Sequence, residues 1–219
     1  KVVITSSLAA VGPSNGSPLD ETAPFNPVSN YGRSKKNMEV MIRDLNLPLN
    51  MCIIRPPAVF GPREDQIYSF FKSAAKGFAP IIGNGLNPLV SMVYVKDLVK
   101  GIQLAAEHMP SGLSTYFITG QKDYCWDEIR LATQQALGKR VRALKIKPEW
   151  VRKAGDLTEN LMKPFGKYPV VNREKALELT LEWRCSDQKA RHELGYGAQF
   201  TLEAAIFETI QWYKIHHWI

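Results

Sequence analysis

The sequence has few residues that could bind a metal ion or form disulfide bonds. Its 219 residues include three cysteines and four histidines. Cys52, Cys125 and Cys185 lie far apart, without the spacing of a metal site. An odd number of isolated cysteines is typical of reduced thiols in a cytoplasmic protein. We therefore expect a cytoplasmic location and no metal cofactor.

Long apolar runs are also missing. No stretch approaches the ~20 apolar residues that a transmembrane helix needs, so we expect no membrane partner. The segment 1–12 has the lysine and small residues of a signal peptide, but Thr5, Ser6 and Ser7 interrupt its apolar part. We favour a buried strand followed by a loop.

A dense cluster of charge is the third feature that we do not find. The net charge of +7 is compatible with phosphate-bearing ligands or nucleic acid. The lysines and arginines are, however, expected to be scattered over helical surfaces without a dense run. No zinc finger, RNA-binding sheet or basic-region pattern occurs, so we expect no nucleic-acid partner.

The sequence does contain apolar strands that alternate with amphipathic helices. We predict strands in 2–6, 50–62, 89–95 and 114–120. We take the first to be buried on both faces and the second to end in a proline-rich turn. We predict helices in 31–45, 65–77, 96–108, 126–138, 148–165, 186–195 and 201–218, with Gly138 and Gly195 ending two of them and Thr201 capping the last. Such alternation is typical of a parallel sheet.

The predicted fold class is α/β. It comprises the C-terminal part of a Rossmann-like doubly wound parallel sheet and a smaller, mostly helical substrate lobe. We expect residues 1–140 to form the partial Rossmann-like domain, with interleaved segments of the substrate lobe. Residues 141–219 are expected to belong mainly to that lobe.

The pair Tyr31 and Lys35 is the first candidate for chemistry. Four residues apart at a helix start, the two side chains share one helix face. A neighbouring ammonium favours the phenolate form, so this phenol could exchange a proton with a substrate oxygen. Ser6 and Ser7 follow the first strand, and ligands bind at the carboxyl ends of parallel strands. A surface pair and two strand-end serines are the alternative interpretation.

Five segments together resemble the extended short-chain dehydrogenase/reductase family, in its NAD-dependent epimerase/dehydratase-like branch. They are "VVITSSLAAVGP", "PVSNYGRSKKNME", "CIIRPPAVFGPR", "VYVKDLVKGIQLA" and "RCSDQKARHELGY". The resemblance implies that Ser7 is the catalytic serine, Tyr31 the general acid/base, and Lys35 the residue that holds the nicotinamide ribose. It implies NAD or NADP as cofactor, bound by Ser6, Tyr31, Lys35, Pro57, Ala58 and Val59.

The chain departs from the family in two places. It has no glycine-rich turn to hold a pyrophosphate at a helix N-terminus. We therefore expect a fragment or processed chain that lacks the N-terminal nucleotide-binding part, exposes a sheet edge and is inactive alone. Val90 and Ser91 stand where nucleotide-sugar enzymes carry an arginine and an aspartate, and valine cannot pair with a diphosphate.

The resemblance therefore favours hydride transfer at a secondary alcohol or ketone of a rather apolar small molecule, as in the hydroxysteroid dehydrogenase and dihydroflavonol reductase branches. Arg63 or Arg152 could still serve a diphosphate, so a nucleotide-sugar epimerase or dehydratase stays open. A non-catalytic dinucleotide sensor or scaffold is the alternative of another class. A homodimer through the helix 31–45 is also expected from the family.

Several other side chains have predicted structural roles. Arg55 is left open between a buried structural residue and a ligand group. We expect Phe70, Phe71 and Met92 in the core and Asp97 in a structural position. The five tryptophans are expected to be packing residues: Trp126, Trp150, Trp183, Trp212 and Trp218.

Overall fold

The computed structural model describes residues 1–162 and 172–219 of the chain. The strands in these parts are β1 (Val2–Thr5), β2 (Met51–Arg55), β3 (Ala58–Phe60), β4 (Phe78–Ile82), β5 (Val90–Tyr94), β6 (Leu113–Phe117), β7 (Asp123–Tyr124) and β8 (Arg142–Ile146). The helices are α1 (Asn30–Asp44), α2 (Tyr68–Ala75), α3 (Val95–Glu107), α4 (Trp126–Leu137), α5 (Pro148–Met162), α6 (Arg173–Glu178), α7 (Gln188–Leu194) and α8 (Leu202–Ile215), with a 3-10 turn η1 (Leu8–Ala10).

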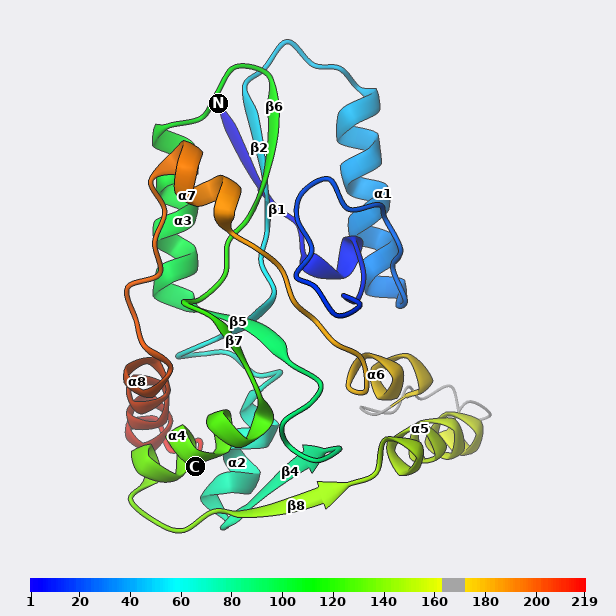
Figure 1. Ribbon diagram of the computed structural model, residues 1–219, viewed down its shortest axis with the longest axis vertical. Coiled ribbons are helices and arrows are strands. Elements are labelled where there is room, and N and C mark those ends of the chain that lie inside the picture. The colour runs from blue at the N-terminus through cyan, green and yellow to red at the C-terminus, as the bar shows by residue number, and fades with distance from the viewer. Residues whose placement is uncertain (163–171) are drawn as a thin grey trace.

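A parallel sheet of three strands, in the order β1-β2-β6, lies between two helical layers (Figure 1). Successive side chains of a strand point to opposite faces. Ile53 of β2 therefore packs with Ile42 of α1, whereas Ile54 packs with Leu98 of α3. This arrangement of helices on both faces of a parallel sheet confirms the predicted Rossmann-like fold class.

The expectation that the first strand is buried on both faces is wrong. Val2 is 38% exposed, and Thr5 is also exposed. Among the described strands, β1 pairs only with β2, so its second edge is open. The apolar run 2–4 could not reveal this, because strand burial depends on what covers the strand.

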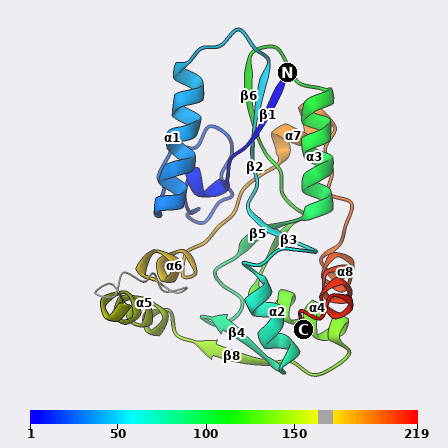
Figure 2. The same cartoon turned by 180° about the vertical axis from the view of Figure 1, so that it is seen from behind.

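The second lobe lies at the other end of the sheet and combines short strands with helices (Figure 2). Its strands form the ladders β3-β5-β7 and β4-β8. The predicted strand 50–62 is in fact two strands, because Pro56 and Pro57 separate β2 from β3. Strands β4 and β8 were not predicted. Arg142 and Lys145 make β8 look like a polar surface segment rather than a strand.

The predicted helix ends are largely confirmed. Gly138 and Gly195 adopt the left-handed conformation directly after α4 and α7, and the Thr201 side chain accepts a hydrogen bond from Ala204 N. The predicted helix 148–165 corresponds to α5, and positions 163–165 lie outside the described residues.

The predicted core residues Phe70, Phe71 and Met92 are buried. The carboxylate of Asp97 is also buried and accepts hydrogen bonds from Gln199 N and Phe200 N, as its structural role requires. Trp126, Trp183, Trp212 and Trp218 are half-buried. The expectation for Trp150 is wrong, since its side chain is 64% exposed on α5.

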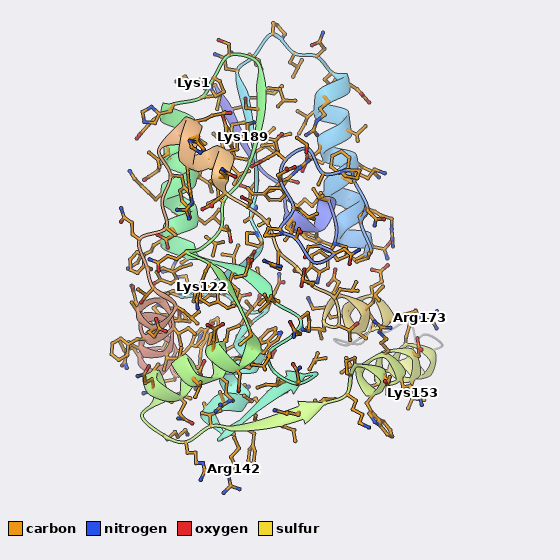
Figure 3. The ribbon with its side chains drawn as sticks, viewed as in Figure 1. Lys1, Lys122, Arg142, Lys153, Arg173 and Lys189 are labelled. Atoms are coloured by element: carbon orange, nitrogen blue, oxygen red, sulfur yellow. The ribbon has the colours of Figure 1, made fainter. Side chains whose placement is uncertain are left out.

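The expectation of scattered positive charge without a dense run is also wrong. Residues 139–153 contain seven lysines and arginines and a single acidic residue, Glu149. The segment covers β8 and the start of α5, at the lower margin of the molecule in Figure 3, where Arg142 and Lys153 are labelled. Such a run is easily overlooked in the sequence, because apolar residues separate its cations.

Candidate active site

The loops that follow β1 and β2 lie side by side. Ser6 N donates to Ile54 O over 2.7 Å, and Leu8 N donates to Pro56 O over 2.9 Å. Ser7 lies between them and is half-buried, and its Oγ accepts a hydrogen bond of 3.1 Å from Ala9 N. The carboxyl ends of these two parallel strands therefore hold the Ser7 hydroxyl beside the proline-rich turn.

The first turn of α1 packs directly against the turn that carries Ser7. Ser29 caps the helix by accepting a hydrogen bond of 3.2 Å from Gly32 N. A Cβ at position 32 would lie 2.4 Å from Ala9 O, so this close approach requires glycine. The contact places Tyr31 on a backbone segment next to that of Ser7.

Tyr31 and Lys35 point to the same side of α1. Lys35 Nζ lies 5.9 Å from the centroid of the Tyr31 ring and donates a hydrogen bond of 2.9 Å to Thr5 O, at the end of β1. The Tyr31 side chain is 55% exposed. The lysine therefore lies near the phenol and binds the carboxyl end of β1, and the phenol remains accessible to a ligand.

Ser6 points into the protein instead. It is buried, and its Oγ donates a hydrogen bond of 2.6 Å to Glu39 Oε1. Glu39, fully buried on α1, also accepts from Arg55 Nε over 2.9 Å, from Arg55 Nη2 over 2.7 Å and from Arg43 Nη1 over 3.0 Å. The question left open for Arg55 is thus resolved in favour of a buried structural role.

Aromatic rings enclose this buried ion pair. The Arg55 guanidinium lies 5.2 Å from the centroid of Phe25 and 5.5 Å from that of Phe117. Burial acts to raise the pKa of the Glu39 carboxyl. Hydrogen bonds from Arg55 and Ser6, with the charge of Arg55, outweigh burial, so the pKa lies below its ordinary value. Glu39 is therefore ionised at neutral pH and joins α1 to β1 and β2.

Glu39 is the residue of this site that the sequence analysis missed. Tyr31, Lys35 and Glu39 are spaced four residues apart, so all three lie along one stripe of α1. Lys35 contacts the end of β1 and lies near the Tyr31 ring, and Glu39 contacts Ser6 from the interior. The position of Glu39, four residues after Lys35, was the available signal.

The three residues predicted to line the nicotinamide pocket follow β2. Pro57 is buried, Ala58 is exposed and Val59 is half-buried. With Ser7, Tyr31 and Lys35, the residues Ala58 and Val59 present accessible polar and small apolar groups at adjoining strand ends, which could hold the nicotinamide–ribose end of a dinucleotide. In the parts of the chain described, no three His, Cys, Asp or Glu side chains are grouped as metal ligands.

Val90 and Ser91 lie in the protein interior. Val90 is 8% exposed and Ser91 is fully buried. The Ser91 hydroxyl donates to Asp123 and accepts a hydrogen bond of 3.0 Å from Cys185 N. Arg184 Nε donates to the same aspartate over 2.7 Å. These groups join β5 and β7 to the segment that follows residue 182.

A serine, tyrosine and lysine at the carboxyl ends of a doubly wound parallel sheet are the arrangement of the extended short-chain dehydrogenase/reductase class. A family model of the "NAD dependent epimerase/dehydratase family" matches residues 1–118, more than half of the chain. The chain belongs to this family.

Curated relatives of the chain carry out different reactions, according to their names. An N-acetyl-alpha-D-glucosaminyl-diphospho-ditrans,octacis-undecaprenol 4-epimerase of Escherichia coli O157:H7 is 26% identical over 98% of this chain and 66% of that protein. A 3-beta-hydroxysteroid dehydrogenase of Mycolicibacterium neoaurum is 28% identical over 89% of this chain and 56% of that protein. The chain thus spans less than two thirds of the length of these relatives.

Solved structures share the fold. The crystal structure of gox2253 superposes with a TM-score of 0.74 at 26% identity, over 98% of this chain and 66% of that chain. A dTDP-glucose 4,6-dehydratase of Bacillus anthracis in complex with NAD superposes with a TM-score of 0.72 at 19% identity, over 99% of this chain and 62% of that chain.

Proposed function

We propose that the protein is an NAD(P)-dependent oxidoreductase that transfers a hydride at a secondary alcohol or ketone of a rather apolar small molecule. The observation that carries the proposal is that Lys35 Nζ lies 5.9 Å from the centroid of the Tyr31 ring and 2.9 Å from Thr5 O, at the end of β1. The family match supports a nicotinamide dinucleotide as cofactor.

Each side chain has a role in this reaction. Tyr31 accepts or returns the proton of the substrate oxygen, and the Ser7 hydroxyl donates a hydrogen bond that orients that oxygen. An ammonium has three donors. Lys35 uses one on Thr5 O and keeps the others for the cofactor ribose. The bound dinucleotide supplies the hydride acceptor or donor.

Two observations support an apolar substrate. Val90, at the position of the family's diphosphate-binding arginine, packs in the same core cluster as Met92 and Tyr124. It therefore contributes no cation to a ligand. Relatives of the chain include a steroid dehydrogenase and a protein named as a ceramide reductase from Caulobacter vibrioides.

Epimerisation of a sugar bound to a diphosphate is the second candidate. It is favoured by the 26% identity to the Escherichia coli epimerase named above. Arg63 is exposed and could contact a diphosphate. Arg152 is less suited, since its Nε donates to Thr180 Oγ1 over 3.1 Å.

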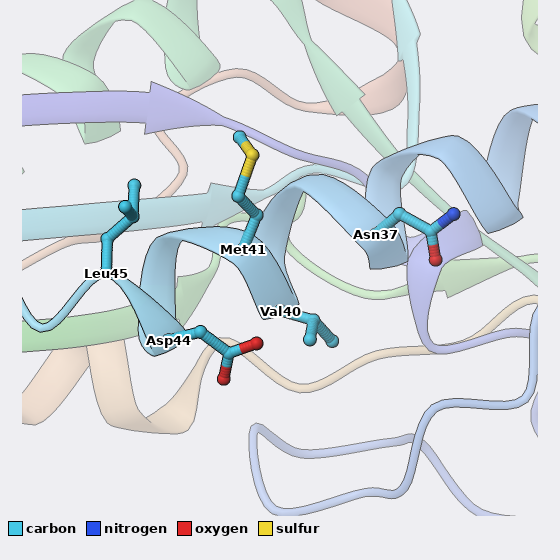
Figure 4. Close-up of a pocket in the computed structure, with 5 residues that line it drawn as sticks. All are labelled: Asn37, Val40, Met41, Asp44 and Leu45. Carbon is cyan, nitrogen blue, oxygen red and sulfur yellow. The ribbon is translucent and has the colours of Figure 1, made fainter.

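A cytoplasmic location and a homodimer are further parts of the proposal. The three cysteines are free and buried, which agrees with a reducing compartment. A second copy of the chain could pack on the outer face of α1, where Met41 is 57% and Leu45 55% exposed (Figure 4). Met38 and Ile42 of α1 pack on the sheet instead.

A substrate panel tests the function. Protein expressed from the complete gene is assayed with NAD⁺ and NADP⁺ against hydroxysteroids, long-chain alcohols and UDP- or dTDP-sugars, by the absorbance of the reduced nicotinamide and by chromatography of the sugars. We expect the protein from the complete gene to turn over an apolar alcohol. The 219-residue chain alone should show no turnover. Turnover of sugar nucleotides only would refute the substrate class.

A further inference from the structure

The outer face of the β4-β8 ladder is apolar and uncovered by the described residues. Ile81 of β4 is fully buried, so alternation places Phe78 and Pro80 on the opposite face. In the parallel register Phe78 pairs with Arg142, and Pro80 pairs with Leu144. Phe78 is 50% and Leu144 is 55% exposed.

Helix α5 directly follows β8 in the chain and also exposes apolar side chains. Its inner face packs on α6, where a Cβ added at Gly155 would lie 2.6 Å from the Cβ of Ala176. Trp150 and Leu157 lie two turns apart on the opposite side, and are 64% and 60% exposed. Lys153 Nζ lies 5.7 Å from the centroid of the Trp150 ring. The helix therefore presents an apolar stripe to solvent, flanked by a cation.

The positive charge of the chain is concentrated in the same place. The segment 139–153 has seven cations and one acid, in a chain whose net charge is +7. Within residues 1–162 and 172–219, none of the seven forms an ion pair. Arg142 lies at the bottom and Lys153 at the lower right of the molecule in Figure 3, and Lys1 lies near the top.

We propose that this margin is a docking surface for an anionic lipid bilayer. The docking surface consists of Phe78, Arg142, Leu144, Trp150, Lys153 and Leu157. Apolar side chains enter the boundary between headgroups and acyl chains, and nearby cations are attracted to anionic headgroups. Unpaired cations around exposed apolar side chains provide both interactions.

The surface fits a lipid better than a nucleic acid. Phosphate backbones are bound by cations and polar groups, and bases stack on aromatic rings. Leu144 and Leu157 can do neither, yet they are as exposed as Phe78 and Trp150. No helix in the described residues is long and apolar enough to cross a bilayer. The inference thus revises the expectation of no membrane partner, and it does not depend on the proposed reaction.

Flotation with vesicles tests the proposal. The protein is mixed with vesicles of phosphatidylcholine alone or with phosphatidylglycerol, at low and high salt. We expect binding to the anionic vesicles that weakens with salt, and a fall of roughly tenfold or more in the partition coefficient for Arg142→Glu/Lys153→Glu. Lys1→Glu/Lys100→Glu changes the net charge equally at a distance, and should alter binding less than twofold. Equal losses for both double variants would overturn the proposal.

The apolar contribution is tested separately. Trp150→Ser/Leu157→Ser should lower partitioning at least fivefold, whereas Val99→Ser/Phe207→Ser, at exposed apolar positions elsewhere, should not. Brominated lipids should quench tryptophan fluorescence in the native protein and much less in Trp150→Phe. Because these residues are exposed, circular dichroism should show an unchanged fold. Quenching unaffected by Trp150→Phe, or tighter binding to duplex DNA than to anionic vesicles at equal salt, would overturn the proposal.

Discussion

The charged residues of the active-site half and those of the margin formed by the segment 139–153 lie in opposite environments. At the sheet, Glu39 is paired with both Arg43 and Arg55, and Glu39 and Arg55 are buried. At the margin, the cations of β8 and α5 are exposed and unpaired within the described residues. Buried charges hold backbone segments in place, whereas exposed charges stabilise the fold little and are free to bind a partner. The contrast predicts different responses to mutation.

The largest effect on stability is expected for Arg55→Met. It leaves the Glu39 carboxylate buried without its main partner, and breaking such a pair lowers the free energy of unfolding by about 3–5 kcal/mol. Arg142→Met is the matched control at the margin and should change it by no more than about 0.5 kcal/mol. Urea unfolding measures both. Similar losses in the free energy of unfolding for the two variants would contradict the difference between the buried and the exposed charges.

Gly32→Ala should have the next largest effect. The new Cβ would lie 2.4 Å from Ala9 O, so α1 must move away from the Ser7 turn. Such overpacking lowers the free energy of unfolding by about 1–3 kcal/mol, and turnover should fall with it. Gly197→Ala is the control, because its Cβ meets no atom within 4 Å. A Gly32→Ala protein as stable and active as the native one would contradict the described packing.

Acid should weaken the active-site half selectively. The pKa of folded Glu39 lies below the ordinary value of 4.5, so its ionised form stabilises the fold. That stabilisation is complete above the ordinary pKa and is lost as the pH falls through the lowered value. Urea unfolding at several pH values between about 7 and 3 should show a steeper acid loss for the native protein than for Glu39→Gln. Identical slopes would place the acid-sensitive group elsewhere.

The smallest effect is expected at the margin. Leu144→Ser removes an exposed leucine and should change the free energy of unfolding by about 0.5 kcal/mol or less. Ile54→Ala, in the buried sheet, should lower it by about 2–5 kcal/mol. A large loss from Leu144→Ser would indicate that the described chain itself covers this position.

Much of the active-site half could be predicted from the sequence, because local patterns determine it. Tyr31 and Lys35 share a helix face whatever lies around them, and Gly138 ends its helix through its own conformation. Glu39 escaped notice because the burial of a carboxylate depends on Arg55 and Ser6, which are distant in sequence. The exposure of Trp150 could not be predicted from the sequence either. A tryptophan side chain is expected to be buried, and its exposure becomes evident only in the folded structure.

The proton-transfer role of Tyr31 is tested most directly by Tyr31→Phe in protein from the complete gene. The change removes only the hydroxyl, so the turnover number should fall at least roughly hundredfold while cofactor affinity, measured by titration, stays within about threefold. Tyr68→Phe, on α2, removes a phenol outside the site and should leave turnover unchanged. A Tyr31→Phe protein with the turnover number of the native protein would contradict the central claim, because phenylalanine has no hydroxyl with which to exchange the proton.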